Sequence, residues 1–375
     1  MNSSTTTRGL TFDIRPSSAR RTPQERAELM ANPGFGKVFT DHMVTVRYSA
    51  EEGWHDARLE PYGPLHLDPA TSALHYAQEI FEGLKAYRHS DGTFVCFRPE
   101  ANAARFDQSA RRMAMPELPQ ELFLGAIETL LAHDGEWMPT QEGHSLYLRP
   151  FMFSTDVSLG VNNPSSSYLF VLIASPAASY FAGGIKPVSV WLSEDYTRAA
   201  PGGTGQAKFA GNYAASFLAQ AQAISKGCDQ VVWLDAVEHR WVEEMGGMNL
   251  FFVFGSGDDA RIMTPALTGT LLPGITRQSL LQLAPELGIA AEEGRISTEE
   301  WRSAAQNGDL TEVFACGTAA VITPVGRVAS SAGEFLVGGG EPGPVTMRLR
   351  DELVGIQFGE RTDHMGWLRQ LGAAG

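Results

Sequence analysis

The pattern of apolar and polar positions predicts extended segments near residues 43–49 and 92–98. Between them, the apolar residues of LHYAQEIFEGLKAY recur at helical spacing as far as Phe81, so we expect a helix that Gly83 interrupts. Further helices are expected over 100–114 and 119–133. A short helix should also run to about Met30 after Thr22-Pro23-Gln24-Glu25, which carries a capping-box pattern with proline at the first helical position.

A change of pattern in the middle of the chain predicts two domains. The strand-like run YLFVLIAS at 168–175 leads into PAASYFAGGIKP, whose proline, glycine and small residues are typical of a linker. We therefore expect an N-terminal domain at 1–174, a linker at 175–187 and a C-terminal domain at 188–375. Residues 1–21, rich in Ser, Thr and Arg, should be poorly ordered.

The C-terminal half predicts antiparallel strands followed by a helix. VVWLD at 231–235, RWVEE at 240–244 and NLFFVF at 249–254 have the composition of strands separated by turns. After them, LLPGITRQSLLQLAPEL predicts a loop that leads into a helix beginning near Ile275 and Thr276.

Composition narrows the classes of function. The 375 residues are 43% hydrophobic, enough for two cores, and the net charge of −14 argues against binding to nucleic acid or an anionic membrane. The three cysteines, Cys96, Cys228 and Cys316, match no CxxC pattern, so we expect reduced thiols in a cytoplasmic protein and no disulfide framework or zinc site. No apolar run reaches the roughly 18 residues of a membrane span.

Several familiar catalytic and nucleotide-binding motifs are incomplete or absent in this chain. PGGTGQAK at 201–208 lacks the glycine before its lysine and the Ser or Thr after it that a P-loop requires. GSGDDA at 255–260 is not followed by the helix of a dinucleotide fold, so we interpret it as a hairpin turn. No HExxH or GxSxG motif occurs, His42 beside Asp41 is interpreted as structural, and no metal site is expected.

Four motifs in order resemble those of the class IV aminotransferases, which use pyridoxal 5′-phosphate. They are KFAGNY at 208–213, EEMGGMN at 243–249, LPGITRQS at 272–279 and CGTAAVITPV at 316–325. Three more, FGKVFTDHM at 35–43, IFEGLKAY at 80–87 and YLRPFMFSTDVSLGV at 147–161, are similar to branched-chain amino acid aminotransferases. The resemblance implies an α/β (α+β) fold of PLP fold type IV, with a smaller N-terminal α/β domain and a larger C-terminal domain holding a mixed β pseudo-barrel.

Lys208 is one of only five lysines, and the chemistry of the cofactor needs one. A lysine amine must hold the cofactor's aldehyde, and it must be desolvated or near positive charge to react at neutral pH. A carboxylate must face the pyridine nitrogen to keep it protonated. A strand would turn one of Glu243 and Glu244 inward, and the resemblance selects Glu244.

The resemblance also assigns the remaining contacts. Tyr213 bonds the phenolic oxygen of the cofactor, and the phosphate is held by Arg105, Ile275, Thr276 and Thr318, where a helix N-terminus supplies N–H donors. Substrate contacts fall on Phe35, Tyr76, Phe81 and Tyr147 as an apolar wall, on Thr318 and Ala319 for the α-carboxylate, and on Arg149 for the second carboxylate of glutamate. Leu159 and Val161 match a loop that a partner subunit contributes, which implies a homodimer.

The function implied is a ping-pong transfer of the amino group of L-leucine, L-isoleucine or L-valine to 2-oxoglutarate. A D-amino acid aminotransferase or an aminodeoxychorismate lyase would share Lys208 and Glu244 and differ in the pocket. An NAD-dependent dehydrogenase and a non-catalytic binding or scaffold protein are the alternatives from other classes, and both would purify without the cofactor's colour.

Overall fold

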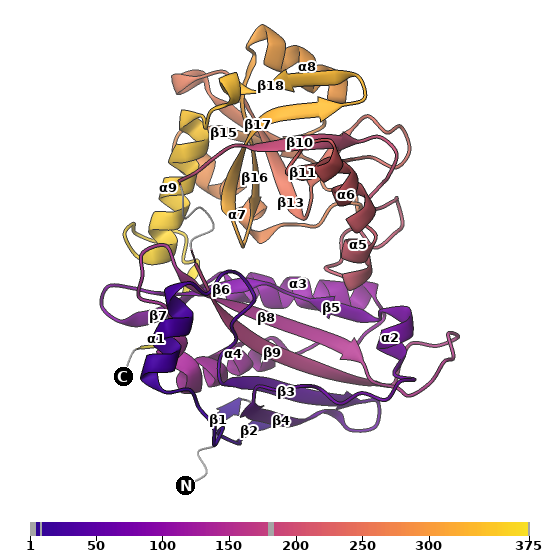
Figure 1. Ribbon diagram of the computed structural model, residues 1–375, viewed down its shortest axis with the longest axis vertical. Helices are drawn as coiled ribbons and strands as arrows, with labels where there is room; N and C mark the ends of the chain where they lie inside the picture. Colours follow the sequence, from indigo (N-terminus) through magenta and orange to yellow (C-terminus); the bar gives the residue numbers. More distant parts are fainter. Residues whose placement is uncertain (1–4, 8–9, 179–183, 374–375) are drawn as a thin grey trace. The chain divides into compact units, whose positions relative to one another are not determined.

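The computed structural model describes residues 5–7, 10–178 and 184–373, which fall into two compact units (Figure 1). Unit 1 comprises Met1–Ala182, Ala207–Ala210 and Ile356–Gly375, and unit 2 comprises Gly183–Gln206 and Gly211–Gly355. The chain returns to unit 1 at its end because strand β19 (Leu368–Ala373) pairs with β7 (Thr93–Phe97). Unit 1 therefore holds more of the chain than unit 2, the reverse of the sizes predicted. Residues 179–183 of the predicted linker lie outside the described residues.

Unit 1 contains a ten-stranded sheet in the order β1-β2-β4-β3-β9-β8-β6-β7-β19, with β5 paired to β8. The other strands are β1 (Thr5–Thr7), β2 (Leu10–Ile14), β3 (His42–Ser49), β4 (Gly53–Pro61), β5 (Glu79–Phe81), β6 (Leu84–Arg88), β8 (Ser145–Ser154) and β9 (Ser167–Ala177). Its helices are α1 (Pro23–Ala31), α2 (Ser72–Tyr76), α3 (Pro99–Arg112) and α4 (Gln120–Asp134), with a 3₁₀ turn, η1 (Gly135–Trp137).

The two faces of this sheet differ. Phe106 of α3 and Phe123 of α4 pack against Phe170 of β9, with ring centroids 5.8 and 6.3 Å from it, and this contact anchors the main core of the unit. Side chains alternate between faces along a strand, so Phe151 and Phe153 of β8 point to the other face, where they stack on each other. Helices α3 and α4 cover the first face, whereas Ala73 of α2 packs with Phe151 and Phe153 on the second.

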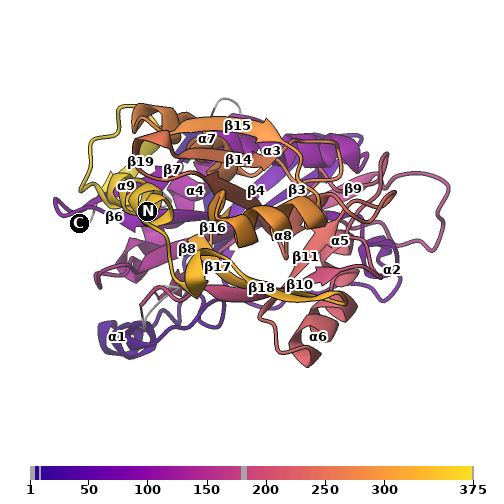
Figure 2. The ribbon, with the colours of Figure 1, turned by 90° about the horizontal axis from the view of Figure 1, so that it is seen from above.

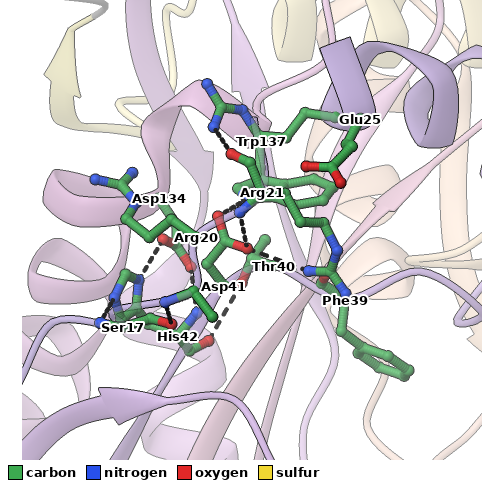
Figure 3. Close-up of polar contacts among 12 residues, drawn as sticks. Ser17, Arg20, Arg21, Glu25, Phe39, Thr40, Asp41, His42, Asp134 and Trp137 are labelled. Atoms are coloured by element: carbon green, nitrogen blue, oxygen red, sulfur yellow. Dashed lines mark hydrogen bonds and ion pairs between the residues drawn. The ribbon is translucent and has the colours of Figure 1, made fainter. Parts of the chain in front are cut away.

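The expectation that residues 1–21 are poorly ordered was wrong for the residues from Leu10 on. Strand β2 pairs with β4, and Phe12 is fully buried. The segment that follows is held by buried polar groups, which Figure 3 shows: the Ser17 N–H donates to Nε2 of His42, whose Nδ1 lies 2.6 Å from Asp134. The polar composition predicted disorder, but the burial of Phe12 and the backbone hydrogen bonds of β2 are enough to order the segment from Leu10 on. Residues 1–4 and 8–9 lie outside the described residues.

The prediction of a helix as far as Phe81 within LHYAQEIFEGLKAY was also wrong. Helix α2 ends at Tyr76, since Ala77 adopts a left-handed conformation with φ of 51°. The chain then forms β5 and β6, both paired with β8, so long-range strand pairing outweighs the local spacing of apolar residues. Gly83 is required between these strands, because a Cβ there would lie 2.0 Å from the Tyr147 hydroxyl oxygen.

Unit 2 is built on a closed barrel of six strands, in agreement with the predicted pseudo-barrel. The order β12-β11-β10-β17-β16-β13 closes because β13 also pairs with β12, and β14, β15 and β18 extend it. The strands are β10 (Val188–Ser193), β11 (Gln230–Leu234), β12 (Val242–Met245), β13 (Met248–Phe254), β14 (Arg261–Pro265), β15 (Ala290–Gly294), β16 (Leu310–Gly317), β17 (Val321–Ser330) and β18 (Gly333–Leu336). Strand β10 runs parallel to β11 and β17, whereas β11, β12 and β13 are antiparallel as predicted.

Helices surround the barrel, as the view in Figure 2 shows. They are α5 (Ala210–Ala214), α6 (Phe217–Ser225), α7 (Ile275–Glu286), α8 (Thr298–Asn307) and α9 (Pro344–Phe358), with 3₁₀ turns η2 (Gly257–Asp259) and η3 (Gly338–Gly340). Val231 and Trp233 of β11 pack against α6, and the alternate residues Val232 and Leu234 point into the barrel core. No helix of the described part of the chain is long and apolar enough to cross a membrane.

Candidate active site

Lys208 is fixed through its backbone to unit 1. Its N–H donates to the Ser109 hydroxyl of α3 at 2.9 Å, and its carbonyl accepts from the N–H of Phe81 at 3.1 Å. The next residue, Phe209, forms a bridge with Ile80. The Lys208 amine lies 4.9 Å from the centre of the Phe81 ring. Strand β5 and helix α3 therefore hold this lysine at both backbone polar groups.

Arg105 is held by a buried carboxylate. Glu82 is fully buried, and its two oxygens accept from Arg105 Nε at 2.7 Å and Nη2 at 2.8 Å, while Asn102 donates at 2.7 Å. Burial raises the pKa of Glu82, but the charge and hydrogen bonds of Arg105, with the charge of Lys208, lower that pKa below its usual value. The carboxylate is thus ionised and fixes the arginine, four residues before Ser109 on α3.

The predicted aromatic wall contacts Arg149 on the face of the sheet opposite helices α3 and α4. The Arg149 guanidinium lies 4.8 Å from the Phe81 ring centre and donates to the Tyr147 hydroxyl at 3.0 Å. Phe35 packs edge-on against Tyr147, with centroids 4.9 Å apart. One ring, that of Phe81, therefore lies against both Lys208 and Arg149.

Three predicted pocket residues form a separate group. The Tyr76 hydroxyl donates to the Leu159 carbonyl at 2.6 Å, and Val161 lines a surface pocket with Tyr76. Leu159 and Val161 are 61% and 68% exposed. Within unit 1, the structure therefore does not bring Tyr76 into the cluster around Phe81.

Glu243 and Glu244 of β12 are both buried, so the expectation that one would point outward was wrong. Glu244 lies 3.2 Å from Arg198 and accepts from the Leu272 N–H at 2.5 Å. Glu243 accepts from the Thr270 hydroxyl at 2.5 Å. Burial raises the pKa of Glu243, and the neighbouring Glu244 raises it further against the Thr270 hydrogen bond. The reason both are buried is that the loop before α7 and Arg198 supply a donor to each acid.

Asn249 joins three of the motifs at one end of the barrel. It pairs across the sheet with Glu244 on one side and with Cys316 on the other. Its side-chain amide donates to the Leu272 carbonyl at 3.0 Å, and a Cβ at Gly274 would lie 2.0 Å from its Oδ1. The segments EEMGGMN, LPGITRQS and CGTA are therefore neighbours in space.

The N-terminus of helix α7 lies beside these segments. The helix begins at Ile275 after Gly274, which makes no side-chain cap, and both Ile275 and Thr276 are buried. The first N–H groups of a helix have no partner within it and attract anions. Thr318 and Ala319 lie in the turn between β16 and β17, directly after Gly317.

Tyr213 lies in α5 beside the paired glycines of EEMGGMN. A Cβ at Gly247 would be 3.4 Å from its ring, and Tyr213, Arg198, Gly246 and Gly247 line one cavity. The structure thus brings Tyr213 close to the strand that carries Glu244.

Sequence reasoning gave no role to Arg198, Asn249 or Glu82. Asn249 and Glu82 stand inside quoted motifs, so the motifs themselves were the available signal. Arg198 stands in no motif, and only the need of a buried Glu244 for a cation could have pointed to it.

Comparison with known proteins gives consistent matches. Residues 79–328 match the family model described as amino-transferase class IV. The branched-chain-amino-acid aminotransferase of Mycolicibacterium smegmatis is 61% identical over 363 residues, 96% of this chain and 98% of the relative. That of Mycobacterium tuberculosis H37Rv is 58% identical over 368 residues, 98% of this chain and all of the relative.

Solved structures agree with these sequences. The branched-chain amino acid aminotransferase of Escherichia coli superimposes with a TM-score of 0.71 at 31% identity, covering 87% of this chain and 99% of that one. The T.th. branched-chain amino acid aminotransferase complexed with N-(5′-phosphopyridoxyl)-L-glutamate superimposes with a TM-score of 0.69 at 29% identity, covering 87% and 98%.

Proposed function

Because this chain belongs to the class IV aminotransferases, we propose that it transfers the amino group of L-leucine, L-isoleucine or L-valine to 2-oxoglutarate by a ping-pong mechanism with pyridoxal 5′-phosphate. The observation that supports this pair of substrates, a branched-chain amino acid and 2-oxoglutarate, is that Lys208 and Arg149 both lie against the Phe81 ring. A five-carbon amino diacid with its α-amino group at the lysine can extend its second carboxylate to the arginine.

The residues present fit the cofactor by their chemistry. Lys208 would hold its aldehyde, Tyr213 its phenolic oxygen and Glu244 its ring nitrogen. Arg105, the α7 N-terminus with Ile275 and Thr276, and Thr318 would hold its phosphate. Glu244 is 1% exposed and ion-paired, which suits an acid that must stay charged beside a cationic ring nitrogen. When bound, the cofactor accepts the amino group and withdraws electrons from the substrate's α-carbon.

Lys208 has a second role as the proton carrier. With cofactor and substrate bound, the free amine of Lys208 would take the proton from the substrate's Cα and return it to the C4′ carbon of the cofactor. The two backbone hydrogen bonds of Lys208 support this role, because they fix the start of a side chain whose end must move.

The pocket serves two kinds of side chain. Phe35, Phe81 and Tyr147 exclude water from a branched aliphatic group, and Arg149 pairs with the second carboxylate of glutamate or 2-oxoglutarate. The N–H groups of the turn at Thr318 and Ala319 hold the α-carboxylate.

The working form is a homodimer of the cytoplasm. The exposed Leu159 and Val161 support the dimer, since apolar side chains on an exposed loop suit insertion into a partner's pocket. Three free, buried cysteines support a reducing compartment.

A substrate panel tests the proposal. Purified protein should show a visible cofactor band that borohydride removes, and it should form glutamate from 2-oxoglutarate with L-leucine, L-isoleucine and L-valine. Equal or faster turnover of the D-enantiomers, or release of pyruvate from aminodeoxychorismate, would contradict it and favour the alternatives on the same fold. A colourless protein that binds NAD would contradict the whole class.

A further inference from the structure

Glu79, Phe81 and Arg149 lie along one face of the unit 1 sheet. The register of β5 on β8 places Glu79 opposite Phe153 and Phe81 opposite Phe151. Residues directly opposite in an antiparallel pair share a face, and the stacked rings of Phe151 and Phe153, 6.0 Å apart, lie on that face. The Arg149 guanidinium also lies there, over Phe81. Glu79 therefore lies on the same face as Arg149, beyond Phe81 along the strand.

Arg149 lacks a close anionic partner in the described part of the chain. Its one side-chain hydrogen bond goes to Tyr147, its Nε is buried with no hydrogen-bond partner, and no carboxylate of the described residues is within 4 Å of it. A partly buried guanidinium is costly unless opposite charge compensates it.

Glu79 carries a carboxyl group on the same face of the sheet. Burial raises the pKa of its carboxyl, and the positive charge of Arg149 acts in the opposite direction. The two groups thus interact electrostatically without forming a contact ion pair.

The two half-reactions place opposite demands on Arg149. A branched aliphatic substrate leaves the guanidinium without a carboxylate, and glutamate brings one. A counter-ion in direct contact with Arg149 would block binding of the glutamate carboxylate. Without any counter-ion, binding of the branched aliphatic substrate would be disfavoured. We propose that Glu79 is a specificity-determining residue that balances the charge of Arg149 from a distance, so that one pocket accepts branched aliphatic and dicarboxylate substrates in turn. This inference rests on the proposed function.

Removing the charge should shift the balance between the two substrate classes. In Glu79→Gln, Arg149 attracts a dicarboxylate more strongly, so the KM for 2-oxoglutarate should fall about three- to tenfold. The KM for L-leucine should rise, because the arginine then lacks compensation beside an apolar group. The change should appear in KM more than in kcat, since Lys208 is untouched.

The test uses the cofactor-loaded enzyme and both substrates. Glu79→Gln is compared with Glu60→Gln, a matched loss of charge in the same unit at a carboxylate that accepts from Thr45. A third and a fourth variant, Arg149→Gln alone and combined with Glu79→Gln, complete a double-mutant cycle. We expect the KM ratio to shift in Glu79→Gln only, and the shift to vanish without Arg149.

An unchanged KM ratio in Glu79→Gln would overturn the inference. An equal shift in Glu60→Gln, or a shift that persists without Arg149, would overturn it as well. Wild-type turnover in the same assay tests the proposed function separately, because the inference can fail while the enzyme still transaminates.

Discussion

The side-chain amide of Asn249 donates a 3.0 Å hydrogen bond to the carbonyl of Leu272, whose own N–H donates to Glu244. Two residues of one hairpin therefore hold the same peptide segment from both sides. That segment leads directly into Gly274 and the first turn of α7. The acid assigned to the ring nitrogen and the helix end assigned to the phosphate are thus placed by one small network.

Asn249→Ala should weaken cofactor binding. Loss of the hydrogen bond to Leu272 frees the turn before α7, at a cost of about 1 kcal/mol, or several-fold in cofactor affinity. Titration of the apoenzyme with pyridoxal 5′-phosphate measures it. Asn307→Ala, which removes an exposed side-chain bond to Asp309, is the control and should bind as the wild type does. Equal affinity in all three proteins would refute the role of Asn249.

Glu82→Gln should destabilise the protein strongly at neutral pH. It leaves the buried Arg105 without its counter-charge, which costs about 3 kcal/mol in urea unfolding. Because the folded pKa of Glu82 lies below its ordinary 4.5, its contribution is present above that pH and is lost as the pH falls through the lower folded value. The gap to wild type should therefore narrow in acid. Glu292→Gln, at an exposed ion pair with Arg261, should cost under about 0.5 kcal/mol.

Gly343→Ala should loosen helix α9. The carboxylate of Glu312 accepts from the N–H groups of Val345 at 3.0 Å and Thr346 at 2.7 Å, and thereby caps this helix. A Cβ at residue 343 would lie 1.9 Å from the Glu312 carboxyl carbon, so the cap must move. We expect a loss of about 2 kcal/mol in the free energy of unfolding. Gly63→Ala, where a Cβ meets nothing within 4 Å, should be close to neutral; similar losses in both would contradict the cap.

Asp107→Asn should stabilise the protein at pH 7.5 and not at pH 4. Burial raises the pKa of Asp107 to about 6, against the hydrogen bond from the Leu118 N–H. The folded state therefore binds more protons than the unfolded state between about pH 4 and 6, and stability rises as the pH falls through that window. Since the side chain is half-exposed, the gain at pH 7.5 is about 1 kcal/mol. Thermal unfolding at the two pH values measures this gain in stability. A gain that does not depend on pH would exclude the ionisation of Asp107 as its cause.

Local signals were sufficient for much of the fold. The capping box at Thr22 and Glu25 starts α1 as predicted, and the apolar run at 168–175 lies within β9. The same reasoning wrongly predicted a helix over residues 74–87. Their apolar spacing fits a helix as well as strands, and only the pairing with β8 decides between them. A short periodic segment does not carry information about a partner strand far along the chain.

The same limit applied to the site. Motifs led to the predicted roles of Lys208 and Glu244, because the chemistry of the cofactor needs an amine and an acid. Nothing in the sequence indicated a role for Arg198, because that role is to pair with Glu244, which is distant in sequence and close only in the folded protein. Position within a motif therefore led to the groups proposed to contact the cofactor, and it gave no role to Arg198, which pairs with one of them.

The central claim, that the amine of Lys208 carries the cofactor, is tested most directly by mass spectrometry of a peptide digest after borohydride reduction of the purified protein. The mass of the reduced cofactor should be found on the peptide that contains Lys208. Its presence on Lys37, Lys85, Lys186 or Lys226, or on no lysine at all, would contradict the assignment.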